Sequence, residues 1–405
     1  MKKICLSVVG LYIGLFAGFG QTKVDSSKYQ NHTLQFEEAN LVSSYYKQDG
    51  NNSAVTGGIG TEKLTDISNT FDLKLFLYDN RFRKHTFNFE LGVDHYTSAS
   101  SDMIDLKANS SASHADTRIY PSVNWTVENE KKGTTVGAGI AYSHEFDYSS
   151  FSLNTNFALK TKNRSGEFSA RAQVFLDQVS QVLPTELVST VTTTTSASGG
   201  GHGTKYPTTP RTTFDLALSY SQIINKRLQV ALLSDVVSQS GYLSLPFHRV
   251  YFKDGSVHQE VLPSSRLKLP LGLRANYFIG DKVILRAYYR YYTDDWGLNS
   301  HTASLEMPVK ITPFFSLSPF YRYYVQTAIN YFSAYGTHTA AEQFYTSNYD
   351  FSAFNSSFYG AGIRLTPPKG VFGMEHLNML EIRYGHYAKN IGMNSDIISL
   401  NLKFK

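Results

Sequence analysis

The sequence predicts an all-β protein, a transmembrane, antiparallel, up-and-down β-barrel of about 16 strands, with long extracellular loops and short periplasmic turns. Three observations support this prediction. Apolar and polar residues alternate with a period of two along most of the chain, long and short connections alternate between these segments, and the chain opens with a secretory leader. Extended strands place successive side chains on opposite faces, so each segment is expected to have one apolar and one polar face.

The leader, MKKICLSVVGLYIGLFAGFG, has two lysines, an apolar run of about 15 residues and small residues at its end. This order predicts a signal peptide over residues 1–20, cleaved after Gly20. The apolar run is shorter than the about 20 residues of a spanning helix, which disfavours a membrane anchor. Cys5 is the only cysteine, so the mature chain would have neither a disulfide nor a cysteine metal site. We divide the mature chain into an N-terminal periplasmic or lumenal segment, 21–37, and a barrel, 38–405.

The stretch ILRAYYRYYTDDWG, residues 284–297, illustrates the alternation. Arg286 and Arg290 share one face of the expected strand, while Leu285 and Tyr289 share the other. We count about 16 such segments of roughly 10–13 residues, longer than the about 5–6 residues of soluble strands and suited to membrane strands of about 9–11. Lipid offers no hydrogen-bond partners, so these strands must close into a barrel without a free edge.

Short and long connections are expected to alternate strictly. The short ones include 79–81, 128–133, 225–227, 280–281 and 312–314, and the long ones include 97–115, 177–210, 238–265 and 326–352. This segregation is typical of a bacterial outer-membrane barrel with both termini on the periplasmic side. We therefore expect the outer membrane as the location and its lipid as a partner. The aromatic last strand, with Phe404, is the segment that we expect the barrel-assembly machinery to read.

The polar faces of the strands are expected to line the lumen. The charged residues predicted there are Asp72, Lys74, Glu90, Asp94, Arg118, Arg274, Arg286, Arg290, Glu306, Lys310 and Arg364. A hairpin of strands 282–293 and 299–311, centred near Trp296, would set Arg286 opposite Glu306 with both pointing inward. Lumen charges of both signs are typical of hydrated pores.

Nucleic-acid binding is the alternative for a strand that mixes arginine with tyrosine. Loss of Lys2 and Lys3 with the leader reduces the 38 basic residues to 36, against 33 acidic residues. Such a balanced chain lacks the strongly basic character of a nucleic-acid-binding domain. We therefore expect no nucleic-acid partner.

Candidate chemistry is confined to the predicted extracellular mouth. The residues concerned are Arg249, Asp294, Asp295, Trp296 and His301. Two carboxylates and a histidine can activate water, which leaves a mouth-located hydrolase open. The same residues can form an ordinary turn, in which Asp295 accepts backbone N–H groups and Trp296 anchors the loop. We favour the turn, assign no catalytic residue and expect no enzyme.

Two further features of the sequence are ambiguous. TGGIGTE, residues 56–62, is rich in glycine but lacks the lysine and the following helix of a phosphate loop, so we expect a loop that folds over the mouth or into the lumen. His248, His258, His301 and His338 fall in predicted outer loops without metal-ligand spacing on a rigid element. We expect solvated histidines and neither a metal nor another cofactor.

Four runs of the sequence carry a family resemblance. SYYKQDGNNSAVTGGIGTEKLTD (44–66), PFHRVYF (246–252), YRYYTDDWGLNSHT (289–302) and PFYRYYVQT (319–327) resemble Gram-negative outer-membrane proteins of the domain of unknown function 3570 family. The resemblance covers essentially the whole mature chain and implies an outer-membrane β-barrel without an established activity. Members of this family tend to be encoded beside exported thioredoxin-like and flavin-transferring proteins, which implies an envelope redox setting.

Three functions remain open from the sequence. The default is a porin-like pore or transporter for a small solute, because a 16-stranded barrel is wide enough for a water-filled lumen unless loops fill it. The segment 21–37 and the loops 44–66 and 189–210 could fill it, but we expect the long outer loops to contribute few apolar side chains that could seal the wall. The alternatives are a structural or docking barrel that binds another envelope protein, and the mouth-located hydrolase.

Overall fold

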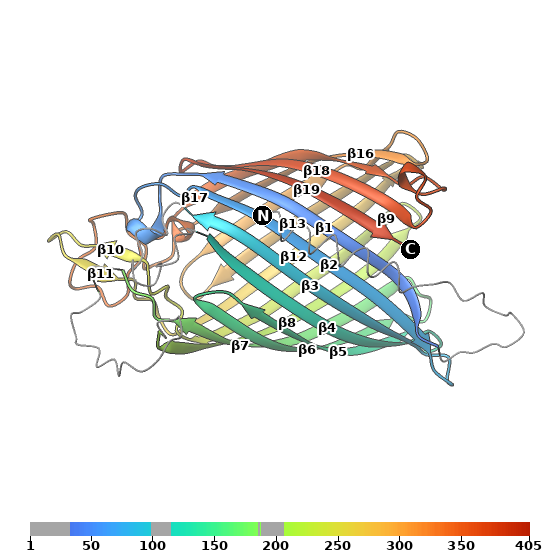
Figure 1. The fold of residues 1–405 in the computed structure, drawn as a ribbon, viewed down its shortest axis with the longest axis horizontal. Helices are drawn as coiled ribbons and strands as arrows, with labels where there is room; N and C mark the ends of the chain where they lie inside the picture. The colour runs from blue at the N-terminus through green and yellow to red at the C-terminus, as the bar shows by residue number, and fades with distance from the viewer. Residues whose placement is uncertain (1–32, 99–114, 185–186, 188–205) are drawn as a thin grey trace, which may run out of the picture.

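The computed structural model describes residues 33–98, 115–184, 187 and 206–405. In these residues one antiparallel sheet curls into a closed barrel (Figure 1). The predicted leader lies outside the described residues, as does most of the segment 21–37. The first strand begins at Gln35, slightly before the predicted start of the barrel at residue 38.

The barrel wall has 16 strand positions, as predicted. Its strands are β1 (Gln35–Asp49), β2 (Leu64–Tyr78), β3 (Lys84–Ser98), β4 (Ala115–Asn129), β5 (Thr134–His144), β6 (Tyr148–Lys160), β7 (Gly166–Ser180), β8 (Thr208–Asn225), β9 (Leu228–Gly241), β12 (Ser265–Ile279), β13 (Val283–Asp294), β14 (Asn299–Glu306), β15 (Val309–Lys310), β16 (Phe315–Gln326), β17 (Phe354–Leu365), β18 (Leu377–Lys389) and β19 (Met393–Phe404). β14 and β15 share one position, because both pair with β13 and β16. Pro308 lies at this interruption, and proline has no N–H to donate to a ladder. β1 pairs with β19, which closes the sheet.

The connections at the two ends of the barrel differ in size. The turn side has 79–83, 130–133, 161–165, 226–227, 280–282, 311–314 and 366–376, and the mouth side has 50–63, 99–114, 145–147, 181–207, 242–264, 295–298, 327–353 and 390–392. The largest connections therefore gather at the mouth, but the strict alternation of short and long is wrong. The mouth-side connections 145–147, 295–298 and 390–392 are short, because a few residues suffice to join adjacent antiparallel strands.

Few elements lie outside the wall in the described part of the chain. β10 (Arg249–Tyr251) and β11 (Val257–Gln259) form a small hairpin within the connection 242–264. η1 (Ala54–Thr56), η4 (Tyr349–Phe351) and η5 (Val371–Gly373) are short 3-10 helices. None of the described helices is long and apolar enough to cross a membrane.

Large apolar side chains are exposed on the outer face of the barrel. On β12 they are Leu267, Leu269, Leu271 and Leu273, which alternate with polar or small residues. Comparable exposed apolar residues occur on β4, β5, β6 and β8. A soluble monomer rarely exposes a continuous apolar surface of this kind, whereas a lipid-facing wall requires one. The chain is therefore an outer-membrane β-barrel.

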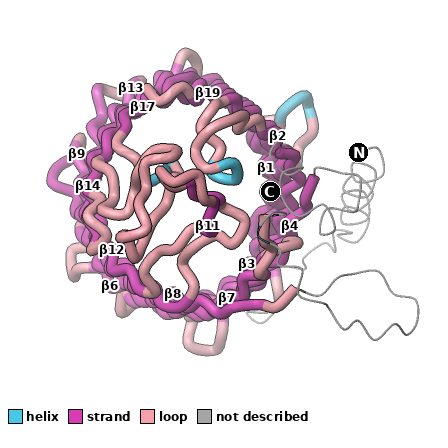
Figure 2. The backbone as a smooth tube through the Cα atoms, turned by 90° about the vertical axis from the view of Figure 1, so that its left-hand side faces the viewer, coloured by secondary structure: helices cyan, strands magenta, loops and turns pink. Residues whose placement is uncertain are grey.

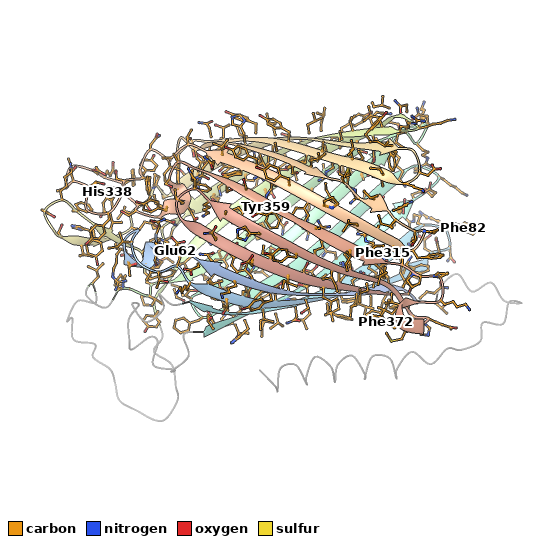
Figure 3. The ribbon with its side chains drawn as sticks, turned by 90° about the horizontal axis from the view of Figure 1, so that it is seen from above. Glu62, Phe82, Phe315, His338, Tyr359 and Phe372 are labelled. Carbon is orange, nitrogen blue, oxygen red and sulfur yellow. The ribbon has the colours of Figure 1, made fainter. Side chains whose placement is uncertain are left out.

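Exposed aromatic side chains lie towards both ends of this outer face, where membrane and water meet. Exposed tyrosines include Tyr321 and Tyr323 on the mouth side and Tyr220 and Tyr277 on the turn side. Figure 3 shows Phe82, Phe315 and Phe372 at the turn end and His338 at the mouth. These positions give the barrel aromatic residues at both of its borders.

Candidate functional site: the lumen wall and the mouth cap

Side chains on the inner face contact one another across the curve of the wall. Arg383 on β18 pairs with Glu306 on β14 at 2.9 Å, although β16 and β17 lie between these strands. Such a contact can form only on the concave side of the sheet. Arg286 lies 3.7 Å from Glu306 and directly opposite it in the ladder. The predicted pairing of Arg286 with Glu306 is thus confirmed.

Most of the predicted lumen charges have a polar partner on the wall. The pairs are Lys74–Glu38, Arg364–Glu381, Asp72–Asn40, Asp94–Tyr120 and Arg118–Ser143. Glu90 lies on the same face of β3 as Asp94, and Lys310 is exposed at the turn-side end of β15. Sequence reasoning missed Glu38, Glu381 and Arg383. The alternation in LNMLEIRYGHYAK, which is β18, could have revealed the last two.

Several arginines of the inner face are accessible. The side chains of Arg286 and Arg364 are 42% and 44% exposed, even though both have carboxylate partners. Arg274 and Arg322 are also exposed and have no carboxylate within ion-pair distance among the described residues. Arg322 lies over the ring of Phe358, with 4.9 Å from its guanidinium carbon to the ring centre. A tightly paired, dry core would bury such groups, so open space adjoins this wall.

The charge of the inner face differs between two halves of the barrel. Arginines gather on the strands from β12 to β18, which we call the basic half; they are Arg274, Arg286, Arg290, Arg322, Arg364 and Arg383. Acids gather on β2 and β3, which lie half-way round the ring from β12 and β13; they are Asp66, Asp72, Glu90 and Asp94. Opposed charges create a field across the lumen that can orient and discriminate ions.

A folded structure, which we call the mouth cap, covers the end of the barrel. It consists of the connections 50–63, 242–264, 295–298 and 327–353, and Figure 2 shows loops that cross the ring of strands in the view along the barrel. Its apolar core comprises Leu262, Trp296, Leu298 and Ile329, with Leu243, Tyr292, Tyr331, Phe332 and Phe351 packed against them. The expectation that the outer loops have too few apolar side chains is wrong. These side chains are scattered over several connections, and only the fold brings them together.

An ion pair between the mouth-side ends of β12 and β13 supports the mouth cap from the wall. The side chains of Arg266 and Asp294 are 9% and 0% exposed, with 2.5 Å between Nη2 and a carboxylate oxygen. The guanidinium lies over the ring of Trp296, 4.3 Å from its centre. The other oxygen of Asp294 accepts the backbone N–H groups of Trp296 and Leu298, each at 3.0 Å. Asp294 therefore shapes the tight hairpin and neutralises a buried arginine.

The carboxylates and the histidine of the proposed hydrolase do not form one site. His301 lies on the outer face, where its ring is 2.7 Å from the hydroxyl of Tyr289. Asp294 points to the other face, and Asp295 accepts the backbone N–H of Leu267 at 3.0 Å. Because the side chains diverge, the geometry supports the turn interpretation of this segment.

The expectation of solvated histidines is wrong for His248 and His338, which are 6% and 0% exposed. Both ring nitrogens of His338 face oxygen atoms, the carboxylate of Glu342 at 2.6 Å and the carbonyl of Thr346 at 3.0 Å. Burial acts to raise the pKa of Glu342, but hydrogen bonds from His338 and Thr339 outweigh it and lower this pKa. These histidines hold the cap together.

The glycine-rich segment 56–62 lies in the mouth cap and permits close contacts there. A Cβ atom at Gly57, whose φ is +79°, would lie 2.5 Å from the ring of Tyr251. Arg249, a predicted mouth residue, is buried and donates a hydrogen bond to the carbonyl of Val55 at 2.7 Å. The glycines therefore let the first connection of the cap meet the β10–β11 hairpin. The loop 189–210 lies largely outside the described residues.

One acidic cluster at the mouth was not predicted. Carboxylate oxygens of Asp116, Glu145 and Asp147 lie within 4.8 Å of one another. Burial, followed by the charges of Glu145 and Asp116, raises the pKa of Asp147 to about 6. The hydroxyl of Tyr96 donates to Glu145 at 2.9 Å. Oxygen ligands suit hard cations, but three acids alone do not define a metal site. The cluster joins the mouth-side end of β4 to the connection 145–147, and sequence spacing does not reveal this contact.

Comparisons with known proteins give a family and a set of distant folds. A family model described as "Protein of unknown function (DUF3570)" matches residues 96–396. No curated protein matches the chain.

Solved structures of similar shape include several barrels. OccK1 (OpdK) of Pseudomonas aeruginosa is 8% identical with a TM-score of 0.40, and the match covers 91% of this chain and 97% of that one. A BenF-like porin from Pseudomonas fluorescens Pf-5 is 9% identical with a TM-score of 0.42, covering 92% and 98%. The siderophore receptor PirA from Acinetobacter baumannii is 10% identical with a TM-score of 0.45, covering 89% and 53%. Likeness at this level carries no functional inference.

Proposed function

The chain belongs to the DUF3570 family. We propose that this outer-membrane barrel is a passage for a small solute across the outer membrane. The mouth cap controls access to the passage, and the charged inner face selects what enters. No catalytic residue forms part of this proposal.

The accessible arginines of the basic half carry the proposal. Placing an unpaired charge in a dry interior costs several kcal/mol, so such charges are tolerated only in contact with water. Arg322 is exposed on the inner face without a carboxylate partner among the described residues, and Arg286 stays 42% exposed despite Glu306. A water-filled lumen accounts for both, and a hydrated lumen with charges of both signs supports ion and solute movement.

Planar-bilayer recordings on two variants test the passage. Arg249 and Gln259 face each other in the β10–β11 hairpin, so Gly-Gly can replace residues 250–258 without stretching the chain. This change removes the contacts of Phe252 with His338 and Tyr345 inside the mouth cap. We expect the intact protein to conduct and the shortened protein to conduct severalfold better.

A matched control shortens the opposite end of the barrel. Replacing residues 368–373, in the turn-side connection 366–376, by Gly-Gly should leave the conductance close to that of the intact protein. If neither the intact nor the cap-shortened protein conducts, the passage fails.

A docking barrel is the second candidate function. The folded mouth cap, with its own buried core around Trp296, would present a defined surface to another envelope protein. Absence of conductance in both variants would favour this function, and capture of a specific partner through the cap would test it directly. The envelope redox setting and the recognition of the last strand by the barrel-assembly machinery stay predictions.

A further inference from the structure

Three buried polar groups without hydrogen-bond partners lie in one cross-strand row of the basic half. Arg290, Thr302, Tyr324 and Ser356 are successive neighbours across β13, β14, β16 and β17. In this row the Nε of Arg290, the Oγ1 of Thr302 and the Oγ of Ser356 have no hydrogen-bond partner within the described part of the chain. Thr302 and Ser356 are only 6% and 2% exposed. Buried polar groups are normally satisfied, so three unpaired atoms side by side set this part of the wall apart, although they are too buried to contact a solute directly.

The adjacent row adds a free cation and an aromatic surface. Ser304, Arg322 and Phe358 are neighbours across β14, β16 and β17. The guanidinium of Arg322 is stacked over Phe358, which limits its motion, and no described carboxylate neutralises it. Phe320 lies 5.0 Å from Phe358, centre to centre. A guanidinium in this setting presents a fixed pair of donors that matches a carboxylate.

A recess of about 240 Å³ lies at this place in the wall. Ser304, Arg322, Phe320 and Phe358 are among the residues that line it, together with Glu306 and Arg383. Glu306 is neutralised by Arg383 at 2.9 Å and by Arg286 at 3.7 Å, so it leaves the positive charge of Arg322 uncompensated. The recess therefore combines positive charge, hydroxyl donors and two aromatic rings, in a volume suited to a single-ring solute.

We propose that this recess is a binding site for a small organic acid, which rests on the proposed function as a passage. The carboxylate of the solute lies at the guanidinium of Arg322 and accepts a hydrogen bond from Ser304, while its apolar body lies against Phe320 and Phe358. The site holds the anion briefly on its way through the lumen. Its affinity is therefore modest, because a transported solute must also leave.

Equilibrium dialysis of radiolabelled benzoate against the detergent-solubilised full chain tests the site without requiring conduction. Benzoate should bind saturably, and acetate and benzamide, which lack the ring or the charge, should compete weakly. Arg322→Gln should weaken benzoate binding about tenfold or more, because it removes hydrogen bonds to a charged group. Arg322→Lys keeps the charge and loses the planar donors. Its affinity for benzoate should lie between those of the unchanged protein and Arg322→Gln.

Two further variants separate a binding role from a structural one. Ser304→Ala should weaken benzoate binding about threefold and leave the thermal stability of the barrel nearly unchanged, because Ser304 lines the recess and the change removes only one hydroxyl. Arg171→Gln is the matched control. Arg171 is an exposed arginine on β7, without an ion pair among the described residues, and its loss should change binding less than about twofold.

The outcomes distinguish this site from the passage itself. Absence of saturable benzoate binding, or equal affinity in Arg322→Gln and Arg171→Gln, would overturn the organic-acid site even if the protein conducts. Binding that follows the expected order in a protein that does not conduct would sustain the site and remove the passage on which its role in transport rests.

Discussion

The mouth cap and the lumen wall use the same kinds of charged residue for different purposes. Where the cap meets the wall, at the mouth-side ends of β12 and β13, Arg266 and Asp294 are almost fully buried and neutralise each other. In the wall, Arg286 contacts Glu306 at 3.7 Å and remains 42% exposed. A buried pair that loses one partner leaves a costly bare charge, whereas a hydrated pair loses little. Burial, more than residue type, therefore decides whether an ion pair holds the fold or tunes the lumen.

The largest expected effect breaks the buried pair. Asp294→Asn leaves Arg266 without its carboxylate and should lower the free energy of unfolding by about 3–5 kcal/mol. Urea unfolding in detergent, followed by the altered gel migration of folded barrels, measures this loss. Glu306→Gln is the control on the wall and should cost about 1 kcal/mol or less. Equal losses in the two variants would contradict the distinction between cap and wall.

Alanine substitutions at two glycines of the cap should give the next largest loss of stability. Gly57 and Gly255 both have positive φ, but a Cβ at Gly57 would meet Tyr251 at 2.5 Å, and one at Gly255 would meet nothing within 4 Å. Gly255→Ala should cost about 1–2 kcal/mol of stability from backbone strain alone. Gly57→Ala should cost about 1–3 kcal/mol more, because Tyr251 must move. The same unfolding assay measures both, and similar values would show that the cap does not need this contact.

The burial of Asp147 at the mouth should make the stability of the barrel depend on pH. The pKa of Asp147 is about 6 in the folded barrel and about 3.8 for an ordinary aspartate. The folded state thus holds a proton that the unfolded chain releases, so this residue lowers stability as the pH rises from about 4 to 6. Asp147→Asn should therefore stabilise the barrel at pH 7.5, by on the order of 1–2 kcal/mol, and have little effect at pH 3.5. Thermal unfolding at the two pH values measures it, and a gain at pH 3.5 alone would reverse the expected sign.

Glu306→Gln should have the smallest effect on stability and a clear effect on ion selectivity. Glu306→Gln removes the carboxylate that Arg286 and Arg383 share. Opposite charges across a strand pair contribute roughly 0.2–1 kcal/mol, so the barrel should remain folded. Reversal potentials in a salt gradient should shift towards anions. A shift towards cations, or none, would show that these arginines do not face the conducting space.

Much of the wall could be predicted from the sequence, because a strand has a simple period. The alternation of apolar and polar residues predicted which face of the sheet each side chain occupies. The turn formers around Trp296 predicted the register that places Arg286 opposite Glu306. The same pattern extends over β18, where Glu381 and Arg383 were overlooked although they share a face. Wherever the backbone repeats, local sequence is enough to place a side chain.

The mouth cap could not be predicted in the same way. Leu262, Trp296 and Ile329 come from three different connections and show no period, so their common core depends on contacts between distant segments. His338 has the sequence surroundings of an exposed loop, and its burial follows from residues on the connection that folds around it and from Phe252 on another. Long-range contacts of this kind leave no local signal.

The pairing of β1 with β19 has a consequence for how the protein is made. Ala39 and Phe404 are neighbours in the closed wall, although they come from opposite ends of the chain. Neighbouring strands can pair with each other over a short stretch of chain, but this final junction must wait until both β1 and β19 are in place. Until then the unfinished sheet has two unsatisfied edges, which invite aggregation. Bringing such distant segments together is intrinsically slow. A chain shortened by its last strand should therefore fail as a whole, with the remaining strands left open to periplasmic proteases.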